Sequence, residues 1–444
     1  MVKKTIAIID RGGRGAALAY AYSKSKHVAK IVVIPGSGLI QINCKKPVLT
    51  FPDIEITDKK QIVSICKKER VDLVDVAQDD AVATGVSDAL LHARFLVTGP
   101  TKKAGRIEWS KAYSRRLLKK AGVLQPEFKV FTNFKDGTKY LDEQPDQPWF
   151  VKADGLVRGK GALSADNNKD AKERIKELSK FGKPGRTYLL EKWLKDNSKT
   201  AEEFSAFAVS DGKSFQIIGY AQDHKRIFDG DKGENTGGIG VSAPPIVVDG
   251  DIKDQSQVIF SKVFEELSRR KTPYRGVLYL GGIIVGGKVY VVEFNARWGD
   301  PEAEALIPTI KNDMYELSHS IARQKLSSLK VHTDKKSRVV VTGCAKGYPN
   351  DIKKVLGAEI KGLTKVSKLK DILIFGASIT ENEGKHFVEG GRLFHVMGVG
   401  KDVVEARAKV YKAMRLIKIE DNGLYFRTDI GWRDVQRRKG RLIK

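Results

Sequence analysis

The sequence predicts a multidomain protein of the α/β and α+β classes. Its 444 residues exceed one ordinary hydrophobic core and indicate about three domains. Strand and helix patterns alternate over the first hundred residues, which favours an open parallel sheet. Two hairpin signals follow further along the chain and favour a separate antiparallel region. We therefore expect domains at residues 1–100, 101–330 and 335–444.

The N-terminal part contains four apolar runs rich in β-branched residues. We expect buried strands at residues 5–9, 30–34, 71–76 and 94–97. Gly12, Gly13 and Gly15 form a glycine-rich turn after the first run, and residues 16–23 read as a helix. Pro35-Gly36 and Gly99-Pro100 end the second and fourth runs, as turn residues do.

The middle of the chain changes to antiparallel patterns. Residues 204–209 and 215–220 flank Asp211-Gly212, and residues 279–285 and 288–294 flank Gly286-Gly287. Both pairs predict hairpins. Further strands are expected at residues 148–151 and 187–193. After a polar linker at residues 325–336, strands at 338–342, 372–377 and 393–399 and a helix at 403–416 predict a small α+β domain.

The composition is that of a globular protein, and it limits the location and partners. Hydrophobic residues make up 41%, and no run is long enough to cross a membrane. The first apolar run ends at Asp10 and Arg11, so it predicts a strand rather than a signal peptide, and a cytoplasmic location. The three cysteines show no CxxC spacing, which argues against a zinc site. The net charge of +26 favours anionic ligands without choosing among them.

Residues 290–302 carry the most informative pattern. On a strand, Glu293, Asn295 and Arg297 point to one face. The other face would carry Val292, Phe294 and Ala296. Carboxylate and amide oxygens are suitable Mg²⁺ ligands, and an adjacent arginine can bind a transferring phosphoryl group. The alternative is an ordinary half-exposed strand with its polar side outward.

Three further segments are weaker signals. Residues 150–161 place Lys152 at a strand end before Gly155, Gly159 and Gly161, with Arg158 and Lys160 adding positive charge. Such a loop could cover phosphates, although the Walker A spacing is absent; a hairpin turn is the alternative.

Residues 189–194 could offer adenine backbone groups and apolar walls from Trp193 and Leu194, with Glu203 near ribose. Residues 222–226 precede a glycine-rich loop at 235–240 that could position substrate. Within them, His224 is expected to be a hydrogen-bonding loop residue rather than a general base.

The order of these segments resembles the phosphoribosylamine–glycine ligase family, of the ATP-grasp class, over nearly the whole chain. The most specific are QDHKR, NTGGIG and EFNARWGDPE, and they are accompanied by VKADG, LLEKWL, KGYP, EGGR and DIGWR. The resemblance implies a Rossmann-like (pre-ATP-grasp) N-terminal domain, an ATP-grasp core, a mobile B subdomain at about residues 115–188 and a small C-terminal domain. It also implies ATP, Mg²⁺ or Mn²⁺, glycine and 5-phosphoribosylamine as ligands, a monomer or dimer, and no nucleic-acid or membrane partner.

The resemblance assigns roles to individual residues. ATP would be bound by Lys111, Lys152, Gly159, Lys160, Gly161, Glu191, Lys192, Leu194 and Glu203. The metal would be held by Glu293 and Asn295. Arg297, Asp223 and Lys225 would act at the reacting groups. Substrate would contact Gly13, Arg14, Asn235, Thr236, Gly237, Gly238, Asp300, Gly391 and Arg392.

The departures from the family pattern lie in the N-terminal domain. The family commonly has Gly-Gly-Arg-Glu-His-Ala where residues 12–17 read Gly-Gly-Arg-Gly-Ala-Ala. Its Pro-Gly-Asn becomes Pro-Gly-Ser at residues 35–37, and its Gly-Pro-Glu-x-Pro-Leu becomes residues 77–82. These segments are expected to recognise the amine, so an ATP-grasp ligase with a different amine acceptor is the alternative function.

Two readings from other classes remain. The N-terminal glycines could belong to a nicotinamide-dependent oxidoreductase, but their spacing is irregular and the row at Glu293 would have no role. The positive charge could belong to a nucleic-acid-binding protein without catalysis, but the basic residues are spread along the chain rather than clustered with aromatic side chains.

Overall fold

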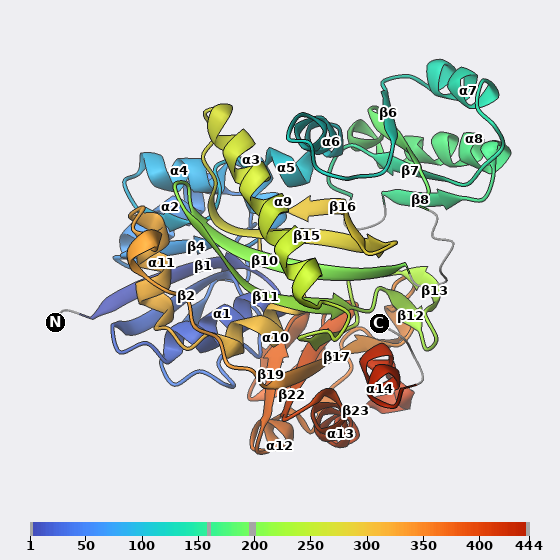
Figure 1. Cartoon of the computed structure of the whole chain (residues 1–444). Coiled ribbons are helices and arrows are strands. Elements are labelled where there is room, and N and C mark those ends of the chain that lie inside the picture. Colours follow the sequence, from blue (N-terminus) through green and yellow to red (C-terminus); the bar gives the residue numbers. More distant parts are fainter. Residues whose placement is uncertain (1–2, 158–160, 195–200, 441–444) are drawn as a thin grey trace.

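The computed structural model describes residues 3–157, 161–194 and 201–440. Its N-terminal part is a five-stranded parallel sheet in the order β3-β2-β1-β4-β5, at the left of Figure 1. The strands are β1 (Lys4–Asp10), β2 (Val28–Pro35), β3 (Val48–Thr50), β4 (Leu73–Val76) and β5 (Leu96–Thr98), and the helices are α1 (Gly13–Ser23), α2 (Lys59–Lys68), α3 (Asp79–Thr84) and α4 (Val86–His92). The predicted parallel sheet is confirmed.

A small lobe projects from the molecule at the upper right of Figure 1. It is a four-stranded antiparallel sheet in the order β6-β9-β7-β8, with two helices packed on it. The elements are β6 (Phe128–Phe131), α7 (Phe134–Asp142), β7 (Trp149–Ala153), β8 (Ala162–Ala165), α8 (Asn168–Glu177) and β9 (Tyr188–Lys192). Before it come α5 (Arg106–Trp109) and α6 (Lys111–Lys120), and α6 contacts β16 of the main sheet as well as β9.

The main body is one continuous nine-stranded sheet that spans the middle and C-terminal parts of the chain. Its order is β16-β15-β10-β11-β14-β17-β22-β19, and β24 also pairs with β17. The strands are β10 (Glu202–Asp211), β11 (Phe215–Asp223), β14 (Gly240–Ala243), β15 (Arg275–Val285), β16 (Lys288–Asn295), β17 (Ser337–Ala345), β19 (Ile372–Gly376), β22 (Arg392–Gly400) and β24 (Leu424–Tyr425). The hairpins β10–β11 and β15–β16 are antiparallel as predicted. The sequence did not predict β14, which joins the two halves.

Helices cover both faces of this sheet. Successive side chains of β10 point to opposite faces and are apolar on both, so each face needs a covering layer. Phe204 and Ala208 lie in a core with α9 (Gly250–Arg269), whereas Phe207 and Val209 lie in another with α10 (Glu302–Leu306) and α11 (Met314–Ala322). Both cores include residues of the N-terminal sheet. The N-terminal domain therefore packs directly against the helices and strands of the main body.

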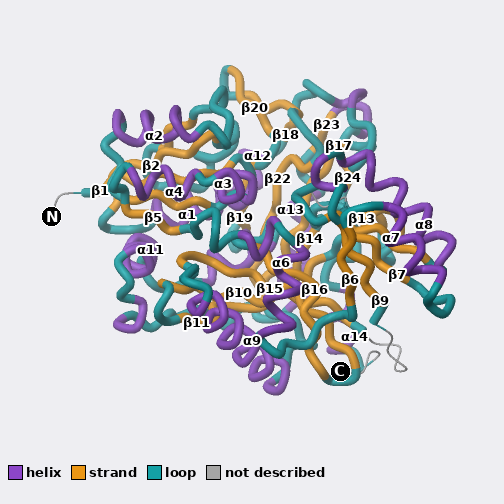
Figure 2. Tube along the Cα trace, turned by 90° about the horizontal axis from the view of Figure 1, so that it is seen from above, coloured by secondary structure: helices purple, strands orange, loops and turns teal. Residues whose placement is uncertain are grey.

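The C-terminal part adds a third core. It contains α12 (Leu363–Ser367), α13 (Val403–Met414), α14 (Trp432–Arg438) and the short strand pairs β18–β23 (Ile360–Lys361, Lys418–Ile419) and β20–β21 (Ile379–Asn382, Lys385–Val388). Figure 2 shows β18, β23, α12 and α13 near β22 and β17. The expected linker at residues 325–336 contains only one short helical turn, at Leu326–Ser328.

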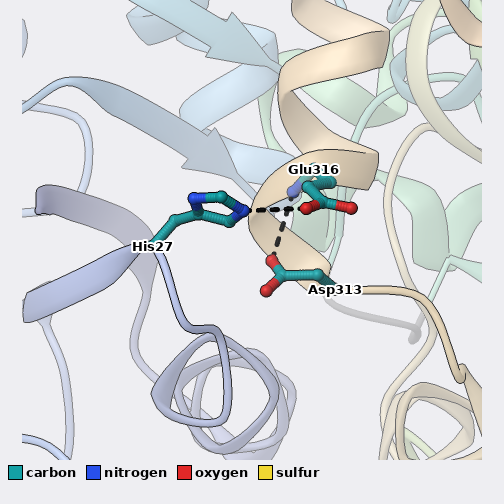
Figure 3. A group of neighbouring side chains, drawn as sticks. All are labelled: His27, Asp313 and Glu316. Carbon is teal, nitrogen blue, oxygen red and sulfur yellow. Dashed lines mark hydrogen bonds and ion pairs between the residues drawn. The ribbon is translucent and has the colours of Figure 1, made fainter. Parts of the chain in front are cut away.

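A surface contact ties the N-terminal domain to α11. His27 Nε2 lies 2.7 Å from Glu316 Oε1 (Figure 3), and the backbone N–H of Lys26 donates to Asp313. Asp313 also caps α11 by accepting from the backbone of Tyr315. Among the described residues, no helix combines the length and apolar character that a membrane span needs.

Candidate active site

The predicted row of polar side chains lies together at the end of β16. The Asn295 amide donates to the Glu293 carboxylate at 3.2 Å, and Arg297 donates to Asn295 Oδ1 at 3.2 Å. Phe294 and Ala296 are buried on the opposite side. Glu293, Asn295 and Arg297 therefore face the same space, as the strand period predicts.

The expectation for Val292 was wrong. The register with β15 shifts so that Glu293 pairs with Gly281 but Val291 pairs with Gly282, which makes a bulge at Val292. Val292 is only half-buried. Its carbonyl and that of Val291 accept hydrogen bonds from Arg115, both at 2.8 Å. The bulge thus lets β16 bind a buried guanidinium from α6 and then resume its alternation.

Three lysines predicted for the site act on Glu293. Burial by itself would raise the pKa of Glu293, but Lys225, Lys111 and Lys152 together lower it. Burial lowers the pKa of Lys111, and Glu293 opposes that shift. The structure thus brings the predicted metal ligand Glu293 and the three predicted site lysines into one electrostatic cluster. A carboxylate kept ionised beside an amide oxygen is a donor set that a divalent cation fits.

Glu191 lies at the centre of a buried ion cluster. Its oxygens accept from Arg115 at 2.6 and 2.9 Å, and Lys152 Nζ lies 2.7 Å away. Burial opposes ionisation, but the two cations hold the pKa of Glu191 at about 2. The backbone of Glu191, in β9, pairs with β6 on one side and with β7 on the other. Glu191 therefore faces Lys152 and Arg115, and the segment that continues past the sheet begins only at Trp193.

The other predicted ATP residues lie around this cluster. The Trp193 ring contacts the Phe150 ring in a tilted arrangement with centroids 4.7 Å apart, and Leu194 is half-buried. Glu203 accepts from Lys225 at 2.8 Å, and Lys192 pairs with Glu127. Of the predicted glycine-rich phosphate loop, the structure describes Gly161, whereas Arg158, Gly159 and Lys160 lie outside the described residues.

The segment at residues 222–226 leaves β11 and passes directly beneath the glycine-rich loop. Asp223 is the last residue of β11, and its Oδ1 is buried without a hydrogen bond. Burial and Glu302 raise the pKa of Asp223 well above its ordinary value. Gly238 has φ +102°, and a Cβ there would lie 2.8 Å from Asp223 Oδ1. Only glycine fits this position without strain.

His224 is the hydrogen-bonding residue that the sequence predicts. Its Nε2 accepts from the backbone N–H of Gly431 at 3.2 Å, at the start of α14. Burial, with Arg427 and Arg433, lowers the pKa of His224 to about 4. The neutral imidazole therefore joins the C-terminal DIGWR segment to the segment that carries Asp223 and Lys225.

Arg392 holds the glycine-rich loop from the other side. Its Nη1 donates to the carbonyls of Gly237, Gly238 and Asp300 at 2.8, 3.0 and 2.8 Å, and its Nη2 lies 3.0 Å from Asp300 Oδ1. Gly391 precedes it against the Tyr348 ring. Thr236 shapes the same loop by bonding the Lys225 carbonyl and accepting from Gly238, while Asn235 is exposed at the end of β13 (Lys232–Asn235).

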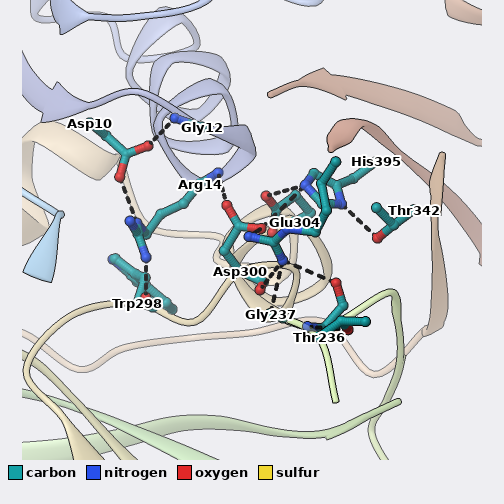
Figure 4. A network of polar contacts seen from close by, with 12 residues as sticks. Asp10, Gly12, Arg14, Thr236, Gly237, Trp298, Asp300, Glu304, Thr342 and His395 are labelled. Carbon is teal, nitrogen blue, oxygen red and sulfur yellow. Dashed lines mark hydrogen bonds and ion pairs between the residues drawn. The ribbon is translucent and has the colours of Figure 1, made fainter. Parts of the chain in front are cut away.

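The predicted N-terminal substrate residues adjoin Asp300. The backbone N–H of Arg14 lies 3.4 Å from Asp300 Oδ2 (Figure 4). The Arg14 guanidinium donates to Asp10 at 2.7 Å, to the Trp298 carbonyl at 2.9 Å and to Gln78. It is buried on protein groups rather than facing open space. The expected helix start at residue 16 was too late, because α1 begins at Gly13 and includes Gly15.

Four buried ionisable residues near the site were not predicted from the sequence. Glu108 lies 3.1 Å from Arg297 and accepts from the backbone of Ala296. Burial raises the pKa of Glu108 to about 7. The others are Arg115, Glu304 and His395. None stands in a distinctive local pattern, because their partners come from distant segments of the chain.

Comparison with known proteins gives a consistent result along the chain. Three family models match: the phosphoribosylglycinamide synthetase N domain over residues 4–108, its ATP-grasp (A) domain over residues 109–303 and its C domain over residues 338–433. The phosphoribosylamine–glycine ligase of Streptococcus pneumoniae serotype 4 is 34% identical, with 97% of this chain and 100% of that protein covered.

Solved structures agree with the sequence matches. A phosphoribosylamine–glycine ligase from Thermotoga maritima has a TM-score of 0.79 at 28% identity, covering 96% of this chain and 99% of that one. A biotin carboxylase domain of the Hydrogenobacter thermophilus 2-oxoglutarate carboxylase, solved with MgADP, has a TM-score of 0.72 at 14% identity, covering 96% and 92%, and shows the shared fold alone. Full-length sequence identity and three matching domain models, together with the site geometry, place this chain in the phosphoribosylamine–glycine ligase family.

Proposed function

We propose that this protein uses ATP to ligate glycine to 5-phosphoribosylamine, giving glycinamide ribonucleotide, ADP and phosphate. The observation that carries the proposal is the row Glu293–Asn295–Arg297 beside Lys111 and Lys225. Two oxygen ligands, an arginine and two lysines at one strand end are what transfer of a phosphoryl group to a carboxylate needs.

The reaction consists of two transfers. A glycine carboxylate oxygen attacks the γ-phosphorus of ATP, the bond to the β-phosphate oxygen breaks, and glycyl phosphate and ADP form. The amine of phosphoribosylamine then attacks the glycyl carbonyl, loses a proton and expels phosphate. A bound Mg²⁺ or Mn²⁺, held by Glu293 and Asn295, would neutralise charge on the ATP phosphates.

The protein's own residues orient and stabilise these groups. Lys111 and Lys152 would contact phosphate oxygens, while Arg297, fixed by Glu108 at 3.1 Å, would neutralise charge on the transferred phosphoryl group. Lys225 carries a firmly held positive charge, since burial would lower its pKa but Glu203 and other acidic neighbours raise it. Asp223 and the Gly237–Gly238 turn would position glycine near the acyl phosphate.

The acceptor amine would lie on the side of Asp300 and Arg392. The altered N-terminal segments reach this side, because Gln78 accepts from Arg14 and Asp79 lies 3.9 Å from Arg297. The residues that depart from the family pattern therefore make contacts within the protein next to the site. The match to phosphoribosylamine–glycine ligases over nearly the whole chain supports phosphoribosylamine as acceptor over a different amine.

The decisive test is ADP formation with both substrates present and with each omitted. We expect full turnover to require glycine and phosphoribosylamine together. Glu293→Ala should abolish ADP formation, whereas Glu265→Gln, at an exposed carboxylate on α9, should leave it unchanged. Turnover with glycine and another amine in place of phosphoribosylamine would favour the alternative acceptor. Near-normal turnover by Glu293→Ala would reject the site.

A further inference from the structure

Three metal-ligating side chains meet in the interior behind Asp300. Asp300 precedes α10, Glu304 lies on α10 and His395 lies on β22. Their ligand atoms all lie within 4.8 Å of one another. His395 Nε2 is 3.2 Å from Asp300 Oδ1 and 3.9 Å from Glu304 Oε1. Figure 4 shows the imidazole facing the two carboxylates.

Glu304 is buried, and its carboxylate has no hydrogen-bond partner among the described residues. The residue is 0% exposed. An isolated buried carboxylate is costly unless a positive charge or a proton compensates it. The nearby arginines pair with other carboxylates than Glu304: Arg392 pairs with Asp300, and the Arg14 guanidinium pairs with Asp10. The cluster thus contains two carboxylates, Asp300 and Glu304, and among the described residues the guanidinium that pairs within it is that of Arg392.

The imidazole of His395 is oriented from behind. Its Nδ1 lies 2.8 Å from Thr342 Oγ1, while its Nε2, although 3.2 Å from Asp300 Oδ1, makes no well-directed hydrogen bond to any described residue. With the proton on Nδ1 and donated to Thr342, the Nε2 lone pair points at the carboxylates. That arrangement is unfavourable without a cation between them. A histidine whose second nitrogen is fixed by a hydrogen bond is typical of metal sites.

The separations suit a shared cation. An ion about 2.1 Å from each nitrogen or oxygen ligand in tetrahedral geometry sets the ligands roughly 3.4 Å apart. The measured values of 3.2 and 3.9 Å bracket that figure. Gly13 keeps the space open, because a Cβ there would lie 2.3 Å from both Glu304 Oε1 and His395 Cδ2.

We propose that Asp300, Glu304 and His395 bind a divalent transition-metal ion at a site separate from Glu293 and Asn295. One imidazole with two carboxylates suits Zn²⁺ or Mn²⁺. The ion would join α10, β22 and, through Gly13, the start of α1. It would also fix Asp300 against Arg392 and so hold the acceptor side of the site. Three protein ligands leave a position for water.

The test measures metal binding without nucleotide or substrates, so its result is independent of the ligase activity. Protein dialysed against EDTA is titrated with Zn²⁺ and with Mn²⁺ by calorimetry, and metal content is measured before dialysis. We expect one tight site, weakened by about 100-fold or more in His395→Asn and Glu304→Gln. Co²⁺ should give visible d–d absorption in the wild type and none in these variants.

Two control variants keep the assignment specific. Glu293→Gln removes the ligand at the other site, and His27→Asn alters the surface group of Figure 3, where Asp313 and Glu316 are also near one another. Both should keep the tight site. Circular dichroism establishes that each variant folds, and Asp300→Asn replaces any that does not.

The proposal is overturned if wild type binds no metal more tightly than His395→Asn does, or if His27→Asn removes the tight site. It is also overturned if Glu304→Gln stabilises the protein while wild type binds no metal, since a proton alone would then compensate Glu304.

Discussion

Arg115 and Glu191 form a buried two-pronged ion pair that joins α6 to β9, an inner strand of the small lobe. The same guanidinium binds two carbonyls of β16. One side chain therefore connects the lobe to the strand that carries the predicted metal ligands.

Glu191→Gln is expected to destabilise the protein by about 3–5 kcal/mol at neutral pH, because it leaves Arg115 and Lys152 buried without their carboxylate. The measurement is urea unfolding. Glu265→Gln, which breaks an exposed pair with Arg269, should cost no more than about 1 kcal/mol. Equal effects of the two substitutions would contradict the assignment.

The contribution of Glu191 should also depend on pH. Its folded pKa of about 2 lies below its ordinary 4.5, so its stabilisation is complete above the ordinary value and is lost as the pH falls towards the folded one. The difference in unfolding free energy between wild type and Glu191→Gln should therefore narrow as the pH falls below about 4.5. A difference that stays constant between neutral and strongly acidic pH would show that Glu191 is not held ionised.

Gly238→Ala should lower ligase turnover by about tenfold or more, since a misplaced reacting group is costly. Its new Cβ would displace Asp223 or Pro301, which lie 2.8 and 2.7 Å from that position. Gly384→Ala is the matched control, with φ +75° and nothing within 4 Å of its Cβ. The two variants share the backbone strain, so initial rates that fall equally would mean that the contact with Asp223 is irrelevant.

Arg14→Ala should raise the phosphoribosylamine requirement and also lower stability by roughly 3 kcal/mol, because Asp10 would remain buried without its ion-pair partner. Acceptor KM and urea unfolding are measured together. Arg11→Ala, whose nearest ion pair is an exposed contact with Glu55, serves as control. Unchanged acceptor dependence would exclude Arg14 from the acceptor site.

His224→Leu should lower kcat more than it changes the KM for ATP, because it leaves the Gly431 N–H unpaired and frees the segment between Asp223 and Lys225. In the wild type, burial and the neighbouring arginines favour the neutral imidazole in the folded protein. Its pKa falls from 6.5 to about 4, so stability worth about 3 kcal/mol should be lost as the pH drops through that window. Identical acid sensitivity of wild type and variant would contradict this role.

Local patterns predicted the parts of the fold that depend on neighbours in sequence. Asp211-Gly212 and Gly286-Gly287 fix two hairpins, and period two brings Glu293 and Asn295 together. The same period failed at Val292, because a bulge is determined by the facing strand and by Arg115 rather than by the strand's own residues.

Long-range pairing explains the other differences. Glu304 and His395 are 91 positions apart and meet only because β22 passes beneath α10. The four residues of β14 are too few to show a period, yet they pair with β11 on one side and β17 on the other. Nothing local to these residues identifies their partners.

The β14–β17 pairing has a consequence for dissecting the protein. Cutting the chain near residue 335 would strip β14 of its backbone partners at residues 338–341 and expose an unsatisfied edge that invites aggregation. The C-terminal quarter is therefore not a detachable module. The small lobe has its own four-stranded sheet, so within the described residues its tie to β16 runs through the Arg115 side chain rather than through a strand ladder.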